Sequence, residues 1–174
     1  ITMAAALAVN DLLRGRGIAS APKWPNDVMA GERKICGILS ERIERDAVPG
    51  VAASPAAGMI VGIGLNVNMT GEEADRIDRP ATSILIESGE AADIERTLQD
   101  LLQPLDHWIG KWRRGGFAAI RDGWLDRAGP VGRPLTVHDG DEVKSGLLSG
   151  YGDHGELLLE TENGVDTIWS GDVS

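Results

Sequence analysis

The sequence predicts an α/β fold of the α+β kind, in which a mixed sheet with packed helices precedes a small β-rich domain. Strand-like apolar runs and helical runs fill positions 1–128, and short strand-like segments divided by turn sequences fill 131–174. A chain of 174 residues buries about 70% of its unfolded surface, enough for one main core and a small satellite domain. We therefore expect two domains, at 1–128 and 131–174.

The first domain begins with an alanine- and leucine-rich stretch over 1–13, which predicts a helix that packs on the sheet. Apolar runs at 34–40 and 59–67 predict two strands. The alanine- and proline-rich segment 43–58 between them is expected to be a connecting loop.

A long amphipathic helix is expected from Ile94, because apolar residues recur there at spacings of three and four. The recurring apolar residues are Leu98, Leu101, Leu102, Leu105, Trp108, Ile109 and Trp112, and we expect the tryptophans to be core residues. Pro104 should kink or split this helix, since proline removes a backbone donor. A shorter helix is predicted over 117–127.

The second domain is expected to be a small SH3-like barrel. Candidate strands lie at 134–137, 143–149, 157–160 and 166–169, and the dipeptides Asp-Gly, Gly-Asp and Asn-Gly separate them. These dipeptides are hairpin signals.

The most informative feature is the run K-W-P-N-D at 23–27, which leads into R-K-I-C-G-I-L-S-E at 33–41. Pro25 restricts its own φ and drives the preceding residue toward an extended conformation, so that Asn26 and Asp27 are presented from a stiff bend. This arrangement is typical of polar groups held for chemistry.

Lys34 stands at the mouth of a strand that we expect to be buried on both faces, and Gly37 marks a close approach of a backbone or a ligand. A cation in a low dielectric acts strongly on a nearby anion. A solvated strand end is the alternative interpretation of Lys34, and the neighbouring Asn26 and Asp27 favour a binding role.

A second polar cluster ends the run I-V-G-I-G-L-N-V-N at 60–68. Its two glycines lack the third glycine and the helix of a dinucleotide fingerprint, so we reject that interpretation. Gly62 and Gly64 would instead let a flat ligand lie against the strand, and Asn66 offers the donor and acceptor that suit an adenine edge. The alternative is a strand that ends in two turn-forming asparagines.

The three runs, in this order and spacing, resemble biotin protein ligases, the biotin–[acetyl-CoA-carboxylase] ligase family. The terminal G-D-V-S and the A-T-S-I segment at 81–84 also look like that family, so the resemblance spans the whole chain. It implies a class II synthetase-like catalytic domain, of which 1–128 are the later part, and a C-terminal SH3-like domain. In the family, a glycine- and arginine-rich loop that binds biotin is expected some tens of residues upstream of the K-W-P-N-D run. We therefore expect the 174 residues of this chain alone to bind biotin weakly.

The resemblance implies an enzyme that joins biotin to ATP as biotinyl-5'-AMP, with Mg²⁺, and passes the biotinyl group to a lysine of a biotin carboxyl carrier protein. It implies catalytic roles for Lys34 and Asp27, with Mg²⁺ near the latter. The implied biotin-binding residues are Lys34, Gly37, Ile38 and Gly64. The implied ATP- or adenylate-binding residues are Lys23, Trp24, Asn26, Asn66 and Asn68.

Two alternatives to a biotin ligase stay open. One is a lipoate or octanoate protein ligase or transferase of the same fold, and the other is a non-catalytic module that binds biotin or another protein. The resemblance also implies a homodimer.

Composition excludes several other classes. The 27 acidic and 17 basic residues give a net charge of −10, which repels DNA and anionic membranes, so we expect no nucleic-acid partner for this segment. No apolar run reaches the ~18 residues of a membrane span. The single cysteine, Cys36, predicts a small core residue in the reducing cytoplasm. The histidines lack ligand spacing, so no structural metal is expected.

Overall fold

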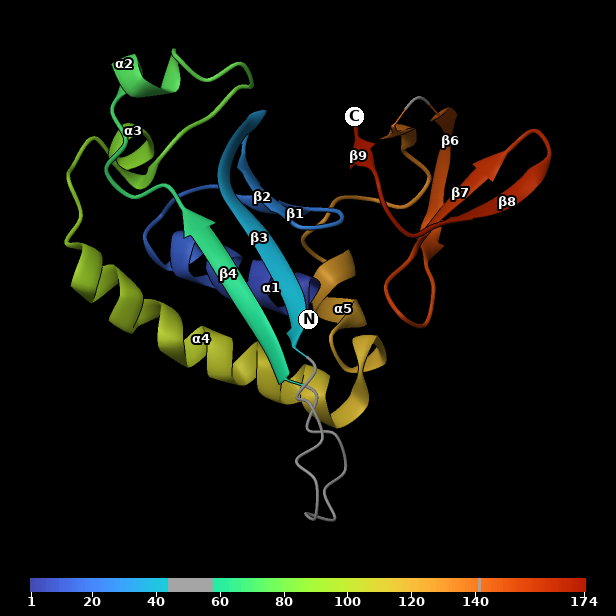
Figure 1. Ribbon diagram of the computed structural model, residues 1–174, viewed down its shortest axis with the longest axis horizontal. Helices are drawn as coiled ribbons and strands as arrows, with labels where there is room; N and C mark the ends of the chain where they lie inside the picture. The colour runs from blue at the N-terminus through green and yellow to red at the C-terminus, as the bar shows by residue number, and fades with distance from the viewer. Residues whose placement is uncertain (44–57, 141) are drawn as a thin grey trace.

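The computed structural model describes residues 1–43, 58–140 and 142–174, and Figure 1 shows its helices and strands. The first part of the chain forms α1 (Thr2–Gly15), β1 (Ala21–Lys23), β2 (Asp27–Ala30), β3 (Arg33–Ile43), β4 (Gly58–Leu65), α2 (Gly71–Ala74), α3 (Ile84–Ser88), α4 (Ile94–Gly115), a 3-10 turn η1 (Phe117–Ala119) and α5 (Arg121–Leu125). The remainder forms β5 (Pro134–Asp139), β6 (Glu142–Tyr151), β7 (Leu157–Thr161), β8 (Gly164–Ile168) and β9 (Asp172–Val173). The predicted loop over 43–58 falls almost wholly outside the described residues.

The first sheet has the order β1-β2-β3-β4, and its neighbouring strands are antiparallel. The sequence predicts a mixed sheet, but the only parallel pairing among the described residues of this sheet is an isolated bridge between Lys34 and Ala81. Helix α1 covers one face of this sheet, as Figure 1 shows. Most of its residues are buried alanine, leucine and valine, and the small alanines let the helix approach the strands closely.

Helix α4 packs against α1 and confirms the predicted long amphipathic helix. Pro104 lies inside it without splitting it, so a split at this residue is wrong, and a kink there stays a prediction. Leu101 and Trp108 are buried on either side of Pro104, and this packing holds both halves of the helix in place. Leu98 and Leu102 belong to the recurring apolar residues but are 58% and 56% exposed, because the described residues cover a narrower stripe of the helix.

The helix predicted over 117–127 is divided into η1 and α5, which Ile120 separates.

The second sheet is antiparallel with the order β8-β7-β6-β5-β9, and all four predicted strands are present in it. The fifth strand, β9, was not predicted, because a two-residue strand has no periodicity and forms only by pairing with β5. Strands β8 and β9 are the two edges of this open sheet, and its closure into an SH3-like barrel stays a prediction.

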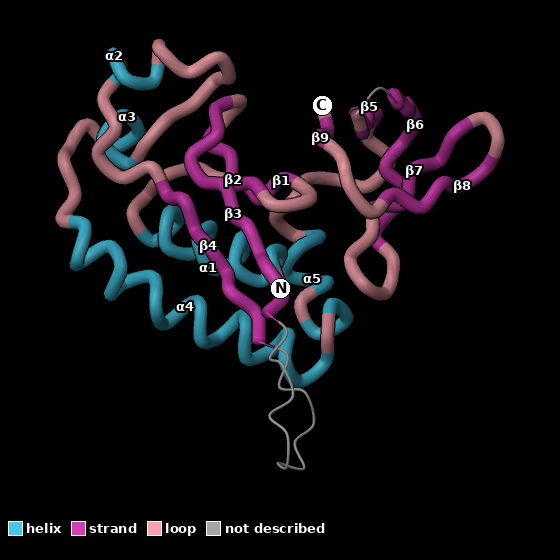
Figure 2. The backbone as a smooth tube through the Cα atoms, viewed as in Figure 1, coloured by secondary structure: helices cyan, strands magenta, loops and turns pink. Residues whose placement is uncertain are grey.

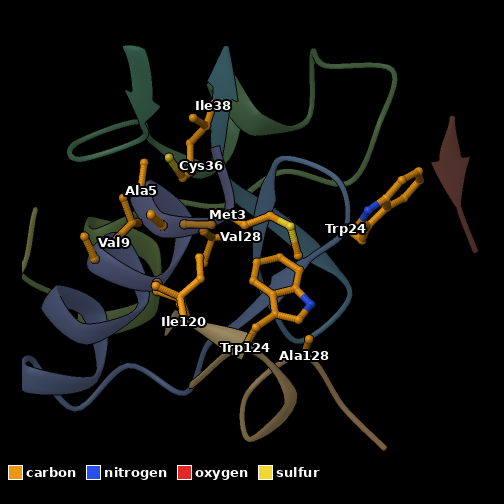
Figure 3. Packing of buried hydrophobic residues seen from close by; sticks show 14 of the residues in the cluster. Met3, Ala5, Val9, Trp24, Val28, Cys36, Ile38, Ile120, Trp124 and Ala128 are labelled. Carbon is orange, nitrogen blue, oxygen red and sulfur yellow. The ribbon is translucent and has the colours of Figure 1, made fainter. Parts of the chain in front are cut away.

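The two sheets lie side by side, as Figure 2 shows, and contribute to one hydrophobic cluster. Figure 3 shows part of that cluster, with side chains from α1, the first sheet and α5. Trp124 of α5 meets Tyr151 of β6 edge to face, with ring centroids 5.9 Å apart. The proposed domain boundary near 128–131 therefore marks a change of secondary structure within a shared core, and two separate domains stay a prediction.

Candidate active site

A β-bulge decides which face of the first sheet Lys34 occupies. Consecutive residues of β2 pair with Cys36 and Lys34, so Ile35 is an extra residue in β3. In a regular strand, side chains alternate, and Lys34 would lie on the face opposite Gly37. The extra residue reverses the alternation and brings Lys34 to the face that carries Gly37 and Asp27.

Lys34 and Asp27 form an ion pair on that face, with 2.6 Å between Nζ and Oδ1. The lysine side chain is 43% exposed and the aspartate side chain 17%, so the ammonium is open to a ligand while the carboxylate supports it from below. Oδ1 lacks a well-aligned hydrogen bond, so the contact is Coulombic in character.

Gly37 makes room for this pair. A Cβ at position 37 would lie 3.0 Å from both Cε and Nζ of Lys34 and 3.7 Å from Oδ1 of Asp27. The missing side chain therefore lets the side chain of Lys34 cross the strand at this point. The sequence predicted a close approach at Gly37 but did not indicate that Lys34 makes it.

A shallow apolar hollow of about 510 Å³ adjoins the ion pair and has a floor of bare backbone. Gly37 lies opposite Gly64, and Leu39 lies opposite Gly62, across β3 and β4. Leu39 is 63% exposed, so the prediction that this strand is buried on both faces is wrong. Helix α1 covers the other face, and no helix among the described residues packs on this one. Ile38 also lines the hollow, although it is only 2% exposed.

Asn26 lies at the rim of the hollow and is held by β3. Its Nδ2 donates to the carbonyl of Ile38 at 2.7 Å, and the Ile38 amide donates to the carbonyl of Asn26 at 2.9 Å. The stiff bend that the sequence predicts at 23–27 is thus tied to the strand that carries Lys34.

Trp24 and Lys23 face away from the hollow, toward the second sheet. Trp24 is 3% exposed, and its Nε1 donates to the carbonyl of Gly155 at 2.9 Å. Lys23 pairs with Asp172 at 3.0 Å. The peptide bond between Trp24 and Pro25 is cis. This geometry gives both side chains a supporting role, and their predicted contacts with the adenylate stay untested.

Asn66 follows β4 on the side of Gly64 and meets the start of β3. Its backbone amide donates to the carbonyl of Ile35 at 2.9 Å, and its Nδ2 donates to the carbonyl of Thr82 at 3.0 Å. The side chain is half-buried, and side-chain alternation counted from Gly64, which lies opposite Gly37, places it on the face of Lys34.

Asn68 has a different environment. Its Nδ2 donates to the carbonyl of Ala92 at 2.8 Å, and its Oδ1 accepts from the amide of Ala92 at 2.9 Å. The side chain therefore holds the segment before α4 with both ends of its amide. Its predicted contact with adenine stays a prediction that this geometry does not favour.

Residues 80–82 form a support for the site whose role sequence reasoning missed. The Lys34 amide donates to the carbonyl of Pro80, and the Thr82 amide donates to the carbonyl of Lys34, both at 2.9 Å. The A-T-S-I resemblance marked this segment, but nothing local in the sequence indicates that it pairs with β3.

Cys36 lies beneath the site and is chemically inert. Burial, together with the nearby Asp27 carboxylate, raises the pKa of its thiol to about 12. The thiol is therefore protonated at neutral pH and acts as a small core side chain.

Among the described residues, no group of three histidines, cysteines or acids could hold a metal ion. No helix in the described ranges is long and apolar enough to cross a membrane.

Comparisons with known proteins agree with this geometry. No protein-family model matches the chain. The biotin–[acetyl-CoA-carboxylase] ligase of Paracoccus denitrificans is 34% identical over 183 residues, which cover 99% of this chain and 71% of the relative. The bifunctional ligase/repressor BirA of Bacillus spizizenii is 32% identical over 176 residues, which cover 99% of this chain and 52% of the relative.

A solved structure of the Aquifex aeolicus biotin protein ligase, in complex with biotin and ATP, has a similar fold. It matches 99% of this chain and 69% of its own chain with a TM-score of 0.78 and 27% identity. The chain thus spans more than two thirds of the Paracoccus and Aquifex proteins and about half of the Bacillus protein. The chain belongs to the biotin protein ligase family.

Proposed function

We propose that this chain supplies the adenylate-forming site of an ATP-dependent biotin protein ligase. In the first step, a carboxylate oxygen of biotin attacks the α-phosphorus of ATP, and pyrophosphate leaves. In the second step, the amine of a carrier lysine attacks the carbonyl of biotinyl-5'-AMP, AMP leaves, and an amide bond forms.

The observation that carries this proposal is the position of Lys34. Its ammonium stands on the open face of the sheet, beside an apolar hollow, and β3, the strand that carries it, accepts a hydrogen bond from the backbone amide of Asn66 through the carbonyl of Ile35. The first step brings two anions together, and a fixed cation lowers their repulsion most where negative charge concentrates, in the transition state. Asp27 holds that cation in place.

The hollow suits the apolar body of biotin. Backbone at Gly37 and Gly64 would form its floor, and the neighbouring Ile38 would complete it. Asn66 would face the adenine, and Asn26 would border the adenylate. Lys23, Trp24 and Asn68 would support the site through the contacts described above.

Mg²⁺ fits this site only through a single protein carboxylate. Asp27 is the carboxylate nearest to Lys34, and Mg²⁺ in nucleotide sites takes one or two carboxylates together with phosphate oxygens and water. When bound, the ion would neutralise phosphate charge.

The proposed acceptor is the biotin carboxyl carrier domain of a biotin-dependent carboxylase, as the name of the Paracoccus relative suggests. The buried, protonated Cys36 suits the reducing cytoplasm, which we propose as the location. The homodimer stays a prediction.

Pyrophosphate release from ATP by the full-length protein tests this function. We expect release that depends on biotin and that lipoate or octanoate does not support. Release with lipoate instead of biotin would favour the ligase of the other acid, and no release with any of them would favour a non-catalytic module.

A further inference from the structure

A small polar network behind the site joins three segments of the chain. The carboxylate oxygen Oε1 of Glu87 accepts from Oγ1 of Thr82 at 2.5 Å and from Nη2 of Arg33 at 2.8 Å. Thr82 is fully buried, and Arg33 directly precedes Lys34 in β3. Glu87 therefore ties α3 to the start of the strand that carries the cation.

Thr82 is hydrogen-bonded to the backbone of Lys34 and to the side chain of Asn66, the two residues that the proposed reaction needs. Its backbone amide donates to the carbonyl of Lys34 at 2.9 Å, and its own carbonyl accepts from Nδ2 of Asn66 at 3.0 Å. A change in the position of Thr82 would move the amide of Asn66 relative to the ammonium.

The bond to Thr82 also fixes which end of the Asn66 amide is free. A carbonyl only accepts hydrogen bonds, so the atom of Asn66 that faces it must be the nitrogen. Oδ1 then points elsewhere, and no residue in the described ranges donates to it. The half-buried side chain thus offers an acceptor to a ligand on this face.

We infer that Glu87 and Thr82 are positioning residues that hold Asn66 as a hydrogen-bond acceptor and thereby select a 6-aminopurine nucleotide. The inference rests on the proposed function, in which Asn66 faces the purine. Adenine presents an amino donor at position 6, whereas a 6-oxopurine presents an acceptor there. Two facing acceptors leave both groups unpaired, so ITP is bound less well than ATP.

Glu87 matters because Thr82 has no access to water. Removal of the carboxylate leaves the buried hydroxyl of Thr82 without its acceptor and leaves Arg33 without its anion. Without this bond, Thr82 and the segment 80–83 are less firmly fixed. The carbonyl of Thr82 then no longer holds the amide of Asn66 in one orientation.

The test is calorimetric titration of the full-length protein with ATP and with ITP. The ratio of the two dissociation constants is compared among the parent, Glu87→Ala, Glu87→Gln and Thr82→Val. We expect the preference for ATP to fall about tenfold in Glu87→Ala and in Thr82→Val. Glu87→Gln keeps an oxygen that accepts from Thr82 and should restore most of the preference.

Asp100→Ala is the matched control. Asp100 is a carboxylate on α4 that bridges Arg16 at 3.2 Å and Arg96 at 2.9 Å, and it touches neither Thr82 nor Asn66. Its loss should leave the ratio of ATP to ITP affinity at the parental value. A general loss of stability would lower both affinities together without changing that ratio.

A parental ratio in both Glu87→Ala and Thr82→Val would overturn the inference while leaving the ligase proposal intact. A parent that binds ATP and ITP equally would overturn it as well. A parent that prefers ATP, with the expected fall in the variants, but releases no pyrophosphate with biotin would support the positioning role and contradict the ligase proposal.

Discussion

Gly37→Ala perturbs the proposed site by adding one methyl group. The new Cβ would stand 3.0 Å from Cε and from Nζ of Lys34, whereas carbon atoms in favourable contact are about 3.5–4.0 Å apart. The end of the lysine side chain is the part that yields, so the ammonium moves by about 0.5–1 Å relative to Asp27.

Such a displacement should reduce catalysis far more than stability. Misplacement of a reacting or stabilising group by about 1 Å costs on the order of a hundredfold in rate, and we expect a tenfold to hundredfold slower adenylate formation. The φ angle of Gly37 lies outside the left-handed region. Alanine is therefore compatible with the backbone, and the free energy of unfolding should change by less than about 1 kcal/mol.

The assay is single-turnover formation of biotinyl-5'-AMP at saturating ATP and biotin, with chemical denaturation as a check of folding. Gly62→Ala is a useful comparison, because it adds the same methyl to the hollow at an ordinary 3.8 Å from the carbonyl of Leu39. It should raise the KM for biotin and leave the saturated rate nearly unchanged. A folded Gly37→Ala protein with the parental saturated rate would refute the reasoning.

Three further predictions concern the surroundings of the site. Asn66→Ala should weaken ATP binding by about 1–3 kcal/mol and leave biotin affinity nearly unchanged, which calorimetry measures; equal losses would instead indicate a structural role. Trp24→Phe should lower the free energy of unfolding by about 1–3 kcal/mol, because the carbonyl of Gly155 loses its buried donor; an unchanged denaturation midpoint would contradict this. Burial raises the pKa of Asp172, but its two cationic partners outweigh this and lower it below the usual value. Its contribution to stability is therefore present above the unfolded-state pKa and lost as pH falls through the folded-state pKa, and thermal melts of Asp172→Asn should show a weaker loss on acidification.

Local patterns in the sequence were sufficient to predict most of the secondary structure. The helix at α4 and the strands β3 and β4 follow from the spacing of apolar residues, and the hairpins of the second sheet follow from their turn dipeptides. These features depend on neighbours in the chain, which a sequence displays directly.

The arrangement of the site depends on contacts between distant segments. The bulge at Ile35 reverses the face of Lys34, and no residue type marks it in the sequence. Trp24 could be assigned to a ligand from its motif, but its ring packs toward Gly155, 131 residues later in the chain. Asn68 was predicted to face adenine from the end of β4, but it lies three residues beyond that strand and its amide binds Ala92. Thr82 gained its role only by pairing beside β3.

The central claim is that Lys34 stabilises the charge that develops when biotin attacks ATP. Single-turnover formation of biotinyl-5'-AMP by the full-length parent and by Lys34→Gln tests it most directly, because glutamine keeps most of the length and removes the charge. We predict biotin-dependent adenylate formation in the parent and a rate about a hundredfold lower in a folded Lys34→Gln protein, with only partial rescue by Lys34→Arg, whose wider planar head does not replace a compact ammonium. A folded Lys34→Gln protein that forms the adenylate at close to the parental rate would contradict the account.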